Sequence, residues 1–235
     1  MKGIRVAGLR GRRGPDPSLF RCTRPPVGGR SPILGRMRLV LDWDVTCTVT
    51  DGLVLAVERF GDPEVYERAE QAIGRRLTLH EVIEMELETM TAPLEEVVAF
   101  LVASLPVRAG LRELVEAHRP LVLSSGFREL IDPLLVREGI TVEVVANRLA
   151  AAGPDGWQPA WRDEAVCSTC GEACKRATLP PGEIVFVGDG YSDLCAARSA
   201  TRVFARDRLC GYLDAAGVPW EPYDDLFDVL RALEA

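Results

Sequence analysis

Short apolar runs without alternation recur along this chain, each bounded by polar or small residues. Runs of this kind predict strands that are buried on both faces, as in parallel sheets. Five of them are predicted as strands: Arg38–Leu41, Leu121–Ser124, Thr141–Ala146, Ile184–Val187 and Thr201–Ala205.

Between these runs, apolar residues recur every three or four positions, which is the period of an amphipathic helix. Alternating strands and helices predict an α/β fold, a three-layer, doubly wound parallel sheet. Four helices are predicted before the second strand, at Val65–Ile73, Leu79–Met90, Leu94–Leu105 and Ala109–Ala117. Three more are predicted after it, at Arg128–Glu138, Asp189–Ser199 and Leu226–Ala232.

The helical segment after the first strand is longer than one crossover between parallel strands needs. We therefore expect a helical cap at residues 52–106, inserted into a core made of residues 37–51 and 107–235. The Gly- and Pro-rich stretch Ala150–Trp161 predicts a loop or a small hairpin. Residues 1–36 lack hydrophobic periodicity, so we expect a disordered basic extension, with Met37 as the natural start.

The charge of the chain excludes two classes of partner. The net charge is −7, but residues 1–36 carry nine Lys or Arg and one acid, which leaves −15 on the remainder. A body this acidic predicts no binding to nucleic acid or to a membrane surface. Seven cysteines, an odd number, without a signal peptide favour reduced thiols and a cytoplasmic location.

Reactive side chains follow three of the predicted strands. In open α/β sheets the carboxyl ends of the strands form the ligand-binding edge. Carboxylates close together need a cation or a shared proton, whereas small hydroxyl residues with free N–H groups suit a phosphate. The first strand is followed by Asp42, Asp44 and Thr46, and the second ends in Ser124, Ser125 and Gly126. Asp189 and Asp193 follow the strand Ile184–Val187. Lys175 lies between the second of these motifs and the third, in the run CGEACKRATL.

These four motifs, in this order, resemble those of the haloacid dehalogenase-like hydrolases, the phosphatases with an aspartate nucleophile. The resemblance runs from about Leu39 to the C-terminus. Within the superfamily the chain is most similar to the branch that holds phosphoserine phosphatase and the methionine-salvage phosphatase acting on a methylthiopentenyl phosphate. The cysteine-rich run before the lysine and the stretch Phe204–Asp207 favour the second. Val45 departs from the family, which usually has Gly there.

The resemblance implies a Mg²⁺-dependent phosphatase that hydrolyses a small phosphorylated metabolite. Asp42 is then the nucleophile, with its second oxygen on Mg²⁺, and Asp44 is the general acid and base, protonated when substrate binds. The main-chain carbonyl of Asp44 can also reach the metal. Asp189 is expected to bind Mg²⁺ directly and Asp193 to bind it through water.

The remaining motif residues are expected to bind the phosphate. Lys175 and Ser124 are placed to hold the oxygens that gain charge in the transition state, with Thr46, Ser125 and Gly126 beside them. The lysine should also contact the nucleophile directly when no phosphoryl group lies between them, and so keep that carboxylate ionised.

Other functions stay open from the sequence. A phosphoserine or phosphoalkylamine phosphatase, a phosphotransferase that uses an alcohol as acceptor, and a non-catalytic phosphometabolite-binding protein all fit the same fold. An amino acid substrate needs a cation for its carboxylate and an acid for its ammonium group. Arg75 or Arg76 and Glu81 or Glu84 are the candidates within the expected cap.

The cysteines before Lys175 allow two interpretations. The spacing of Cys167, Cys170 and Cys174 suits zinc, but a structural zinc site needs four ligands. His80 and His118 are far along the chain, and Cys195 could be the fourth ligand. We favour free thiols that flank the lysine loop.

Overall fold

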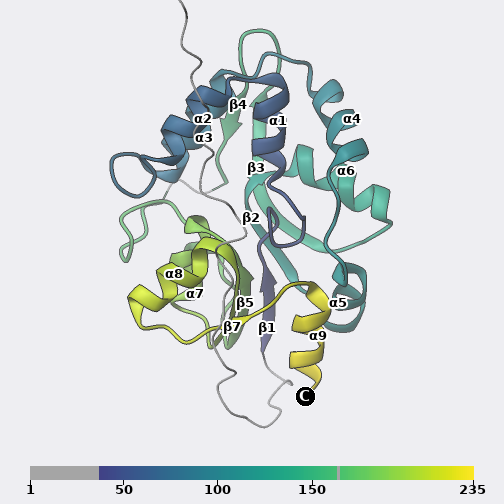
Figure 1. Ribbon diagram of the computed structural model, residues 1–235, viewed down its shortest axis with the longest axis vertical. Helices are drawn as coiled ribbons and strands as arrows, with labels where there is room; N and C mark the ends of the chain where they lie inside the picture. The colour runs from purple at the N-terminus through teal and green to yellow at the C-terminus, as the bar shows by residue number, and fades with distance from the viewer. Residues whose placement is uncertain (1–36, 163–164) are drawn as a thin grey trace, which may run out of the picture.

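One seven-stranded sheet organises the computed structural model, which describes residues 37–162 and 165–235 (Figure 1). The expectations for residues 1–36 lie outside the described residues. The strand order is β4-β3-β2-β1-β5-β6-β7, and every neighbouring pair is parallel except β3 and β4. The strands are β1 (Arg38–Leu41), β2 (Leu121–Phe127), β3 (Glu143–Ala151), β4 (Gln158–Ala160), β5 (Ile184–Gly188), β6 (Arg202–Ala205) and β7 (Glu221–Pro222).

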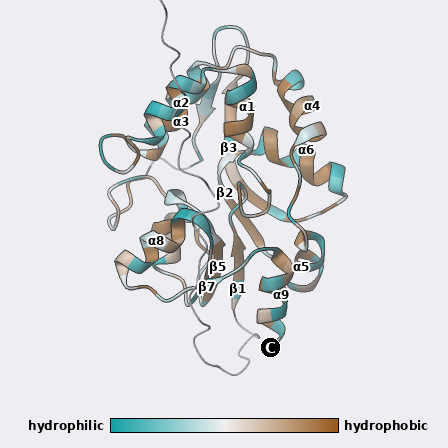
Figure 2. Ribbon diagram, viewed as in Figure 1, coloured by the Kyte–Doolittle hydropathy of each residue, from teal (hydrophilic) through white to brown (hydrophobic). Residues whose placement is uncertain are grey.

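Successive residues of the central strands are buried on opposite faces of the sheet. Leu39 and Leu41 of β1 pack into one core, which also contains residues of α5 (Leu111–His118), α6 (Arg128–Glu138) and α9 (Leu226–Glu234). Val40 belongs to a second core with residues of α7 (Leu194–Ala197) and α8 (Asp207–Ala216). Figure 2 shows the hydrophobic strands between these two layers of helices. The predicted three-layer α/β fold is therefore confirmed.

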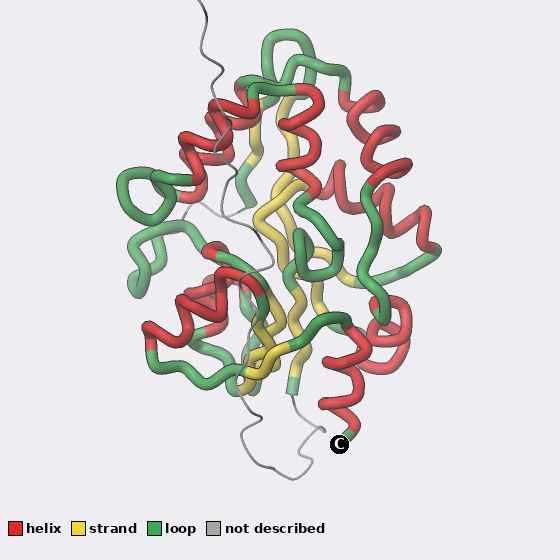
Figure 3. Tube along the Cα trace, in the orientation of Figure 1, coloured by secondary structure: helices red, strands yellow, loops and turns green. Residues whose placement is uncertain are grey.

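Four helices follow β1 and lie above the carboxyl ends of the strands in Figure 3. They are α1 (Gly52–Phe60), α2 (Pro63–Glu70), α3 (Leu79–Glu88) and α4 (Leu94–Ser104). The sequence predicted α2, α3 and α4 but not α1, because its apolar run LVLAV hides the helical period. A side-chain cap defines its start, since Asp51 accepts a hydrogen bond from Val54 N at 3.0 Å. No helix among the described residues is long and apolar enough to cross a membrane.

The stretch Ala150–Trp161, predicted as a loop or a small hairpin, is part of a hairpin formed by β4 and the end of β3. Its Trp157 connects it to the helices above, because the backbone N donates to Leu87 O at 3.1 Å and the indole Nε1 donates to Ala92 O at 2.9 Å. The helix predicted at Asp189–Ser199 is a 3₁₀ turn, η3 (Tyr191–Asp193), followed by the short α7. Helix α8 and strand β7 were not predicted.

Candidate active site

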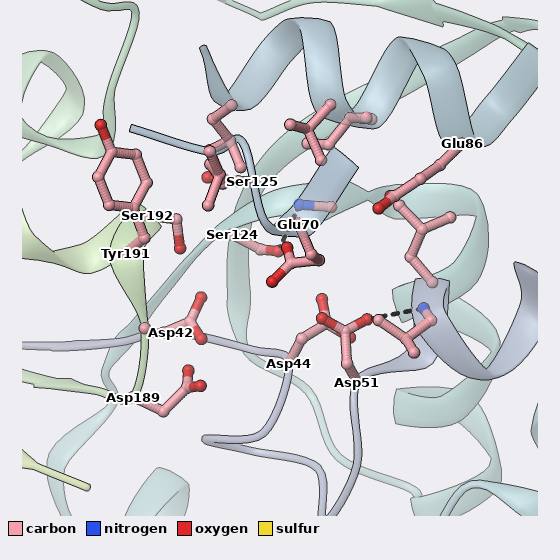
Figure 4. Close-up of a pocket in the computed structure, with 18 of the residues that line it drawn as sticks. Asp42, Asp44, Asp51, Glu70, Glu86, Ser124, Ser125, Asp189, Tyr191 and Ser192 are labelled. Carbon is pink, nitrogen blue, oxygen red and sulfur yellow. Dashed lines mark hydrogen bonds between the residues drawn. The ribbon is translucent and has the colours of Figure 1, made fainter. Parts of the chain in front are cut away.

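A cavity of about 110 Å³ lies where the carboxyl ends of β1, β2 and β5 meet the underside of α1, α2 and α3 (Figure 4). The strand order reverses direction at β1, since the chain runs outward through β2 and β3 and returns to β5 on its other side. Such a switch point leaves a crevice beyond the strand ends. Six of the predicted site residues line the cavity: Asp42, Asp44, Ser124, Ser125, Gly126 and Asp189.

Asp42 directly follows β1, and its position is fixed by the sheet. Its backbone N donates to Val187 O at 2.9 Å, which extends the pairing of β1 with β5. The carboxylate is buried and accepts a hydrogen bond from Lys175 Nζ, so the expected direct contact is present. Burial and the charge of Asp193 raise the pKa of Asp42 to about 6, although Lys175 acts in the opposite direction. The lysine alone therefore does not set the ionisation of the carboxylate.

Lys175 is a buried cation between two carboxylates. It begins η2 (Lys175–Thr178), and its Nζ contacts Asp42 and lies 2.6 Å from Asp193 Oδ1. Burial opposes its charge, but Asp193 and Asp42 outweigh burial and raise the pKa of Lys175. Asp193 itself is fully buried, and its Oδ2 accepts from Asp189 N at 2.9 Å and Gly190 N at 3.1 Å. Asp193 thus holds both the lysine and the loop after β5.

Asp44 projects into the cavity beside Asp51 (Figure 4). Its Oδ1 accepts a hydrogen bond from Gly52 N at 2.8 Å, at the start of α1. Burial, and then the charges of Asp51 and Asp42, raise the pKa of Asp44 well above its usual range. A raised pKa favours the protonated carboxyl group, which is the form that a general acid needs.

The predicted phosphate-binding residues are in different environments. Ser124 Oγ accepts from Gly126 N at 2.8 Å and lines the cavity with Ser125. Thr46 does not line the cavity. It is fully buried, and its hydroxyl lies 3.5 Å from Asp189 Oδ1 and 3.4 Å from the hydroxyl of Tyr223. The Thr46 side chain is therefore placed to orient Asp189 rather than to touch a bound phosphate.

A divalent cation fits the carboxylates at the centre of the site. Oxygens of Asp42, Asp189 and Asp193 all lie within 4.8 Å of one another. Burial, followed by the charges of Asp42 and Asp193, raises the pKa of Asp189 well above its usual range. A bound cation would stabilise carboxylates that raise one another's pKa, and ligands that are all oxygen suit Mg²⁺ rather than zinc.

The upper wall of the cavity contains residues that the sequence analysis missed. Glu86 of α3 is buried, and burial followed by the charges of Asp51 and Glu70 raises its pKa to about 8. Arg208 Nη1 lies 2.7 Å from Glu70 Oε2. The wall also has an apolar part: Leu53, Val54, Ile73, Leu79, Val82 and Ile83. Glu86 lies four residues after Val82, on the buried stripe of α3. This helical spacing could have indicated from the sequence that Glu86 is buried.

The four charged residues proposed for an amino acid substrate do not line this cavity. Glu81 closes the capping box of α3, where its carboxylate accepts from Thr78 N at 2.7 Å. Glu84 Oε1 accepts from Trp161 Nε1 at 3.1 Å. Arg75 and Arg76 line a different depression, beside α8. Each side chain belongs to the outer surface because helix capping and solvation, rather than the cavity, determine its direction.

Val45, in the turn directly after Asp44, has a left-handed backbone conformation, with φ 59°. Val45 N donates to Thr48 Oγ1 at 3.0 Å. The guanidinium of the buried Arg108 donates to the carbonyl oxygens of Val45, Thr46 and Thr48. A glycine would adopt this φ without steric cost, so the departure from the usual residue adds strain at this turn.

Comparison with known proteins finds one matching family and several similar phosphatases. The family model described as haloacid dehalogenase-like hydrolase matches residues 39–198. A 2-hydroxy-3-keto-5-methylthiopentenyl-1-phosphate phosphatase of Geobacillus kaustophilus is 30% identical over 215 residues, which cover 83% of this chain and 94% of the relative. A phosphatase of the same name from Microcystis aeruginosa is 28% identical and covers 82% of this chain and 95% of its own.

Solved structures with a similar fold include phosphoserine phosphatase. A structure described as a phospho-aspartyl intermediate analogue of that enzyme aligns with a TM-score of 0.63 at 16% identity, and covers 84% of this chain and 99% of its own. A substrate-bound phosphoserine phosphatase aligns with the same score and coverage. At this identity the similarity shows the fold alone.

Proposed function

This chain belongs to the haloacid dehalogenase-like hydrolase family and is a phosphatase, and we propose that it hydrolyses 2-hydroxy-3-keto-5-methylthiopentenyl-1-phosphate with the help of Mg²⁺. The observation that supports this choice of substrate is the apolar wall of the cavity, which lies above the carboxylates. A methylthio group at the end opposite the phosphate needs an apolar surface, and each methylene-sized group buried there contributes about 0.8 kcal/mol. The helices of residues 52–106 supply most of this wall and act, in this proposal, as the substrate-selecting cap.

In the proposed reaction, Asp42 attacks the phosphorus atom and forms an aspartyl-phosphate while the bond to the substrate oxygen breaks. Asp44, whose raised pKa favours the protonated form, gives its proton to that departing oxygen and then removes a proton from the water that attacks the phosphoenzyme. This second transfer regenerates the protonated carboxyl group of Asp44, and the attack of water releases inorganic phosphate from Asp42.

Lys175, Ser124 and the backbone N–H groups near Gly126 bind the phosphoryl oxygens, where charge accumulates in the transition state. Asp42 and Asp189 would hold Mg²⁺, with Asp193 behind them on Lys175. When bound, Mg²⁺ neutralises charge on the phosphate and on the carboxylates. Thr46 and Tyr223 keep the Asp189 side chain in place.

Phosphoserine is the second candidate, because the similar solved structures are phosphoserine phosphatases. Among the described residues that line the cavity, Arg208 is the one cation, and it is paired with Glu70. A substrate carboxylate would have to displace Glu70 from that pair. The cavity therefore favours a substrate whose end opposite the phosphate is an uncharged methylthio group over an amino acid.

An assay of the purified protein with Mg²⁺ against the methylthiopentenyl phosphate, phosphoserine and phosphoethanolamine tests the proposal. We expect kcat/KM to be highest for the first substrate. Leu79→Ala, in the apolar wall, should lower that kcat/KM about 3- to 10-fold, whereas Leu94→Ala, on α4 outside the cavity, should not change it. A kcat/KM for phosphoserine equal to or above that for the methylthio substrate would contradict the assignment.

A further inference from the structure

Four cysteines that the proposed phosphatase reaction does not use meet at one point on the molecule. Cys167, Cys170 and Cys174 come from the loop before Lys175, and Cys195 comes from α7. Their four Sγ atoms all lie within 4.8 Å of one another, and each cysteine is free. We propose that these residues, the cysteine cluster, bind one structural Zn²⁺ ion.

The distances within the cysteine cluster suit a metal and not a disulfide. Zinc bound by four thiolates is tetrahedral with Zn–S bonds of about 2.3 Å, which places the sulfurs about 3.8 Å apart. The Sγ atoms of Cys167 and Cys195 are 3.9 Å apart. A disulfide requires about 2.05 Å. Four protein ligands leave no open coordination position, so the site is structural rather than catalytic.

The backbone of the loop forms a closed turn between Cys167 and Glu172. Gly171 has φ 78°, and its N–H donates to Cys167 O at 2.8 Å, while Cys167 N donates to Glu172 O at 2.9 Å. This closed turn holds Cys167 and Cys170 on the same side. In addition, Thr169 N donates to Cys167 Sγ at 3.4 Å. An N–H group directed at sulfur favours the thiolate, which is the form that binds zinc.

The tertiary structure brings the candidate fourth ligand to the other three. Three cysteines within one loop are one ligand short of a structural zinc site. Cys195 lies 28 residues after Cys167 in the chain, and the packing of α7 against the loop before Lys175 brings the two sulfurs together. The proposal therefore takes the zinc interpretation of the sequence in place of free thiols, because all four sulfurs now lie at one point.

The cysteine cluster lies where it would stabilise the catalytic loops. Cys174 directly precedes Lys175, and Cys195 follows Asp193, the carboxylate that holds Lys175. In the same loop, the carboxylate of Glu172 accepts from Leu79 N at 3.3 Å, at the start of α3, and from the hydroxyl of Tyr191 at 2.8 Å. Zinc would thus hold the lysine loop, α7 and the base of α3 in fixed relative positions.

Metal analysis of the full chain, purified with a reducing agent, tests the site. We expect about one zinc per chain. Cys195→Ala should reduce the zinc content to below a fifth of that value, because three thiolates bind zinc far more weakly than four. Cys47→Ala is the matched control, since Cys47 is a buried free cysteine outside the cluster, and it should retain full zinc content.

Two measurements on the unmodified chain keep the test independent of variant folding. Replacement of zinc by Co²⁺ should give the strong visible absorption of tetrahedral thiolate ligation. Removal of zinc by a chelator, with Mg²⁺ restored afterwards, should lower the Tm by more than about 5 °C. The proposal would be overturned by any of three results. The purified protein could lack zinc and have four reactive thiols in the cluster, mass spectrometry could show a disulfide within the cluster, or removal of zinc could leave the Tm unchanged. These readouts need no substrate, so their failure would leave the proposed function unaffected.

Discussion

Arg108 donates a hydrogen bond from its guanidinium to the carbonyl oxygen of Val45, the β-branched residue that the catalytic turn holds at φ 59°. The same guanidinium reaches the carbonyl oxygens of Thr46 and Thr48, and a fourth carbonyl at Asp224. A charged group with four carbonyl partners compensates for the steric cost of the left-handed residue. Arg108 therefore ties the turn after Asp44 to the backbone at Asp224, just before α9.

Val45→Gly should stabilise the protein. The left-handed conformation costs a β-branched residue roughly 1–2 kcal/mol, and glycine removes that cost but adds entropy to the unfolded chain. We expect the free energy of unfolding, measured by urea denaturation, to rise by about 1 kcal/mol. Val49→Gly is the control, because Val49 is exposed and outside the left-handed region, and it should give no gain. A destabilised Val45→Gly variant would show that the turn is not strained.

Arg108→Lys should lower kcat more than it raises KM, because an ammonium group cannot reach four carbonyl oxygens. Loss of these charged hydrogen bonds should reduce the free energy of unfolding by about 2–4 kcal/mol. Arg112→Lys, at an exposed position of the same segment, should have little effect. In the Val45→Gly background the loss should be smaller, and a double-mutant cycle would measure this coupling. Strict additivity would show that Arg108 and Val45 act independently.

Asp42→Asn should abolish turnover and leave the fold intact, since the proposed nucleophile is lost while β1 keeps its pairing. Removal of a nucleophile typically lowers kcat by more than about 10³-fold. Single-turnover assays and circular dichroism would measure both effects. Asp132→Asn, on the surface of α6, is the matched control and should stay active. Appreciable activity in the Asp42 variant would assign the nucleophile elsewhere.

Lys175→Ala should be much worse than Arg176→Ala. Lys175 is buried between Asp42 and Asp193, whereas its neighbour Arg176 is exposed. Loss of the cation that is proposed to stabilise the transferring phosphoryl group should reduce kcat/KM by about 10²–10³-fold. The arginine variant should stay within about twofold of the unmodified protein. Inactivity of Arg176→Ala instead would mean that the arginine, not the lysine, binds the phosphoryl group.

Glu86→Gln should become relatively more stable as pH rises. The pKa of Glu86 is about 8 in the folded protein, against 4.5 as its ordinary value, because burial and the charges of Asp51 and Glu70 disfavour the carboxylate. Between pH 4.5 and 8 the folded state retains a proton that the unfolded chain has lost. The unmodified protein therefore loses up to about 1.4 kcal/mol of stability per pH unit in this range.

The glutamine variant lacks this dependence, so its advantage in the free energy of unfolding should grow from about pH 4.5 and level off near pH 8. Glu84→Gln is the control, because Glu84 is on the outer side of α3 and has no such environment. Parallel stability curves for Glu86→Gln and the unmodified protein would show that Glu86 is ionised throughout.

The sequence by itself determined five parallel strands of the sheet and the identity of its reactive edge. Short apolar runs such as Arg38–Leu41 and Ile184–Val187 indicate strands buried on both faces, and the acids after them then lie at the carboxyl ends of those strands. These features depend on local pattern, and local pattern is readable from the chain. The contact of Asp42 with Lys175 was expected from the resemblance to a known family.

Only the tertiary structure decided which residues from distant segments share an environment. Thr46 turns toward Asp189 and Tyr223, Glu86 enters the cavity although it is charged, and Cys195 reaches Cys167 across 28 residues. The buried stripe of α3 marks the position of Glu86, and the sequence offers Cys195 as a candidate ligand, but neither pattern states which side chains lie beside these residues. Each depends on how helices pack over the strand ends, because burial and the distances between side chains are set by contacts between segments far apart in the sequence.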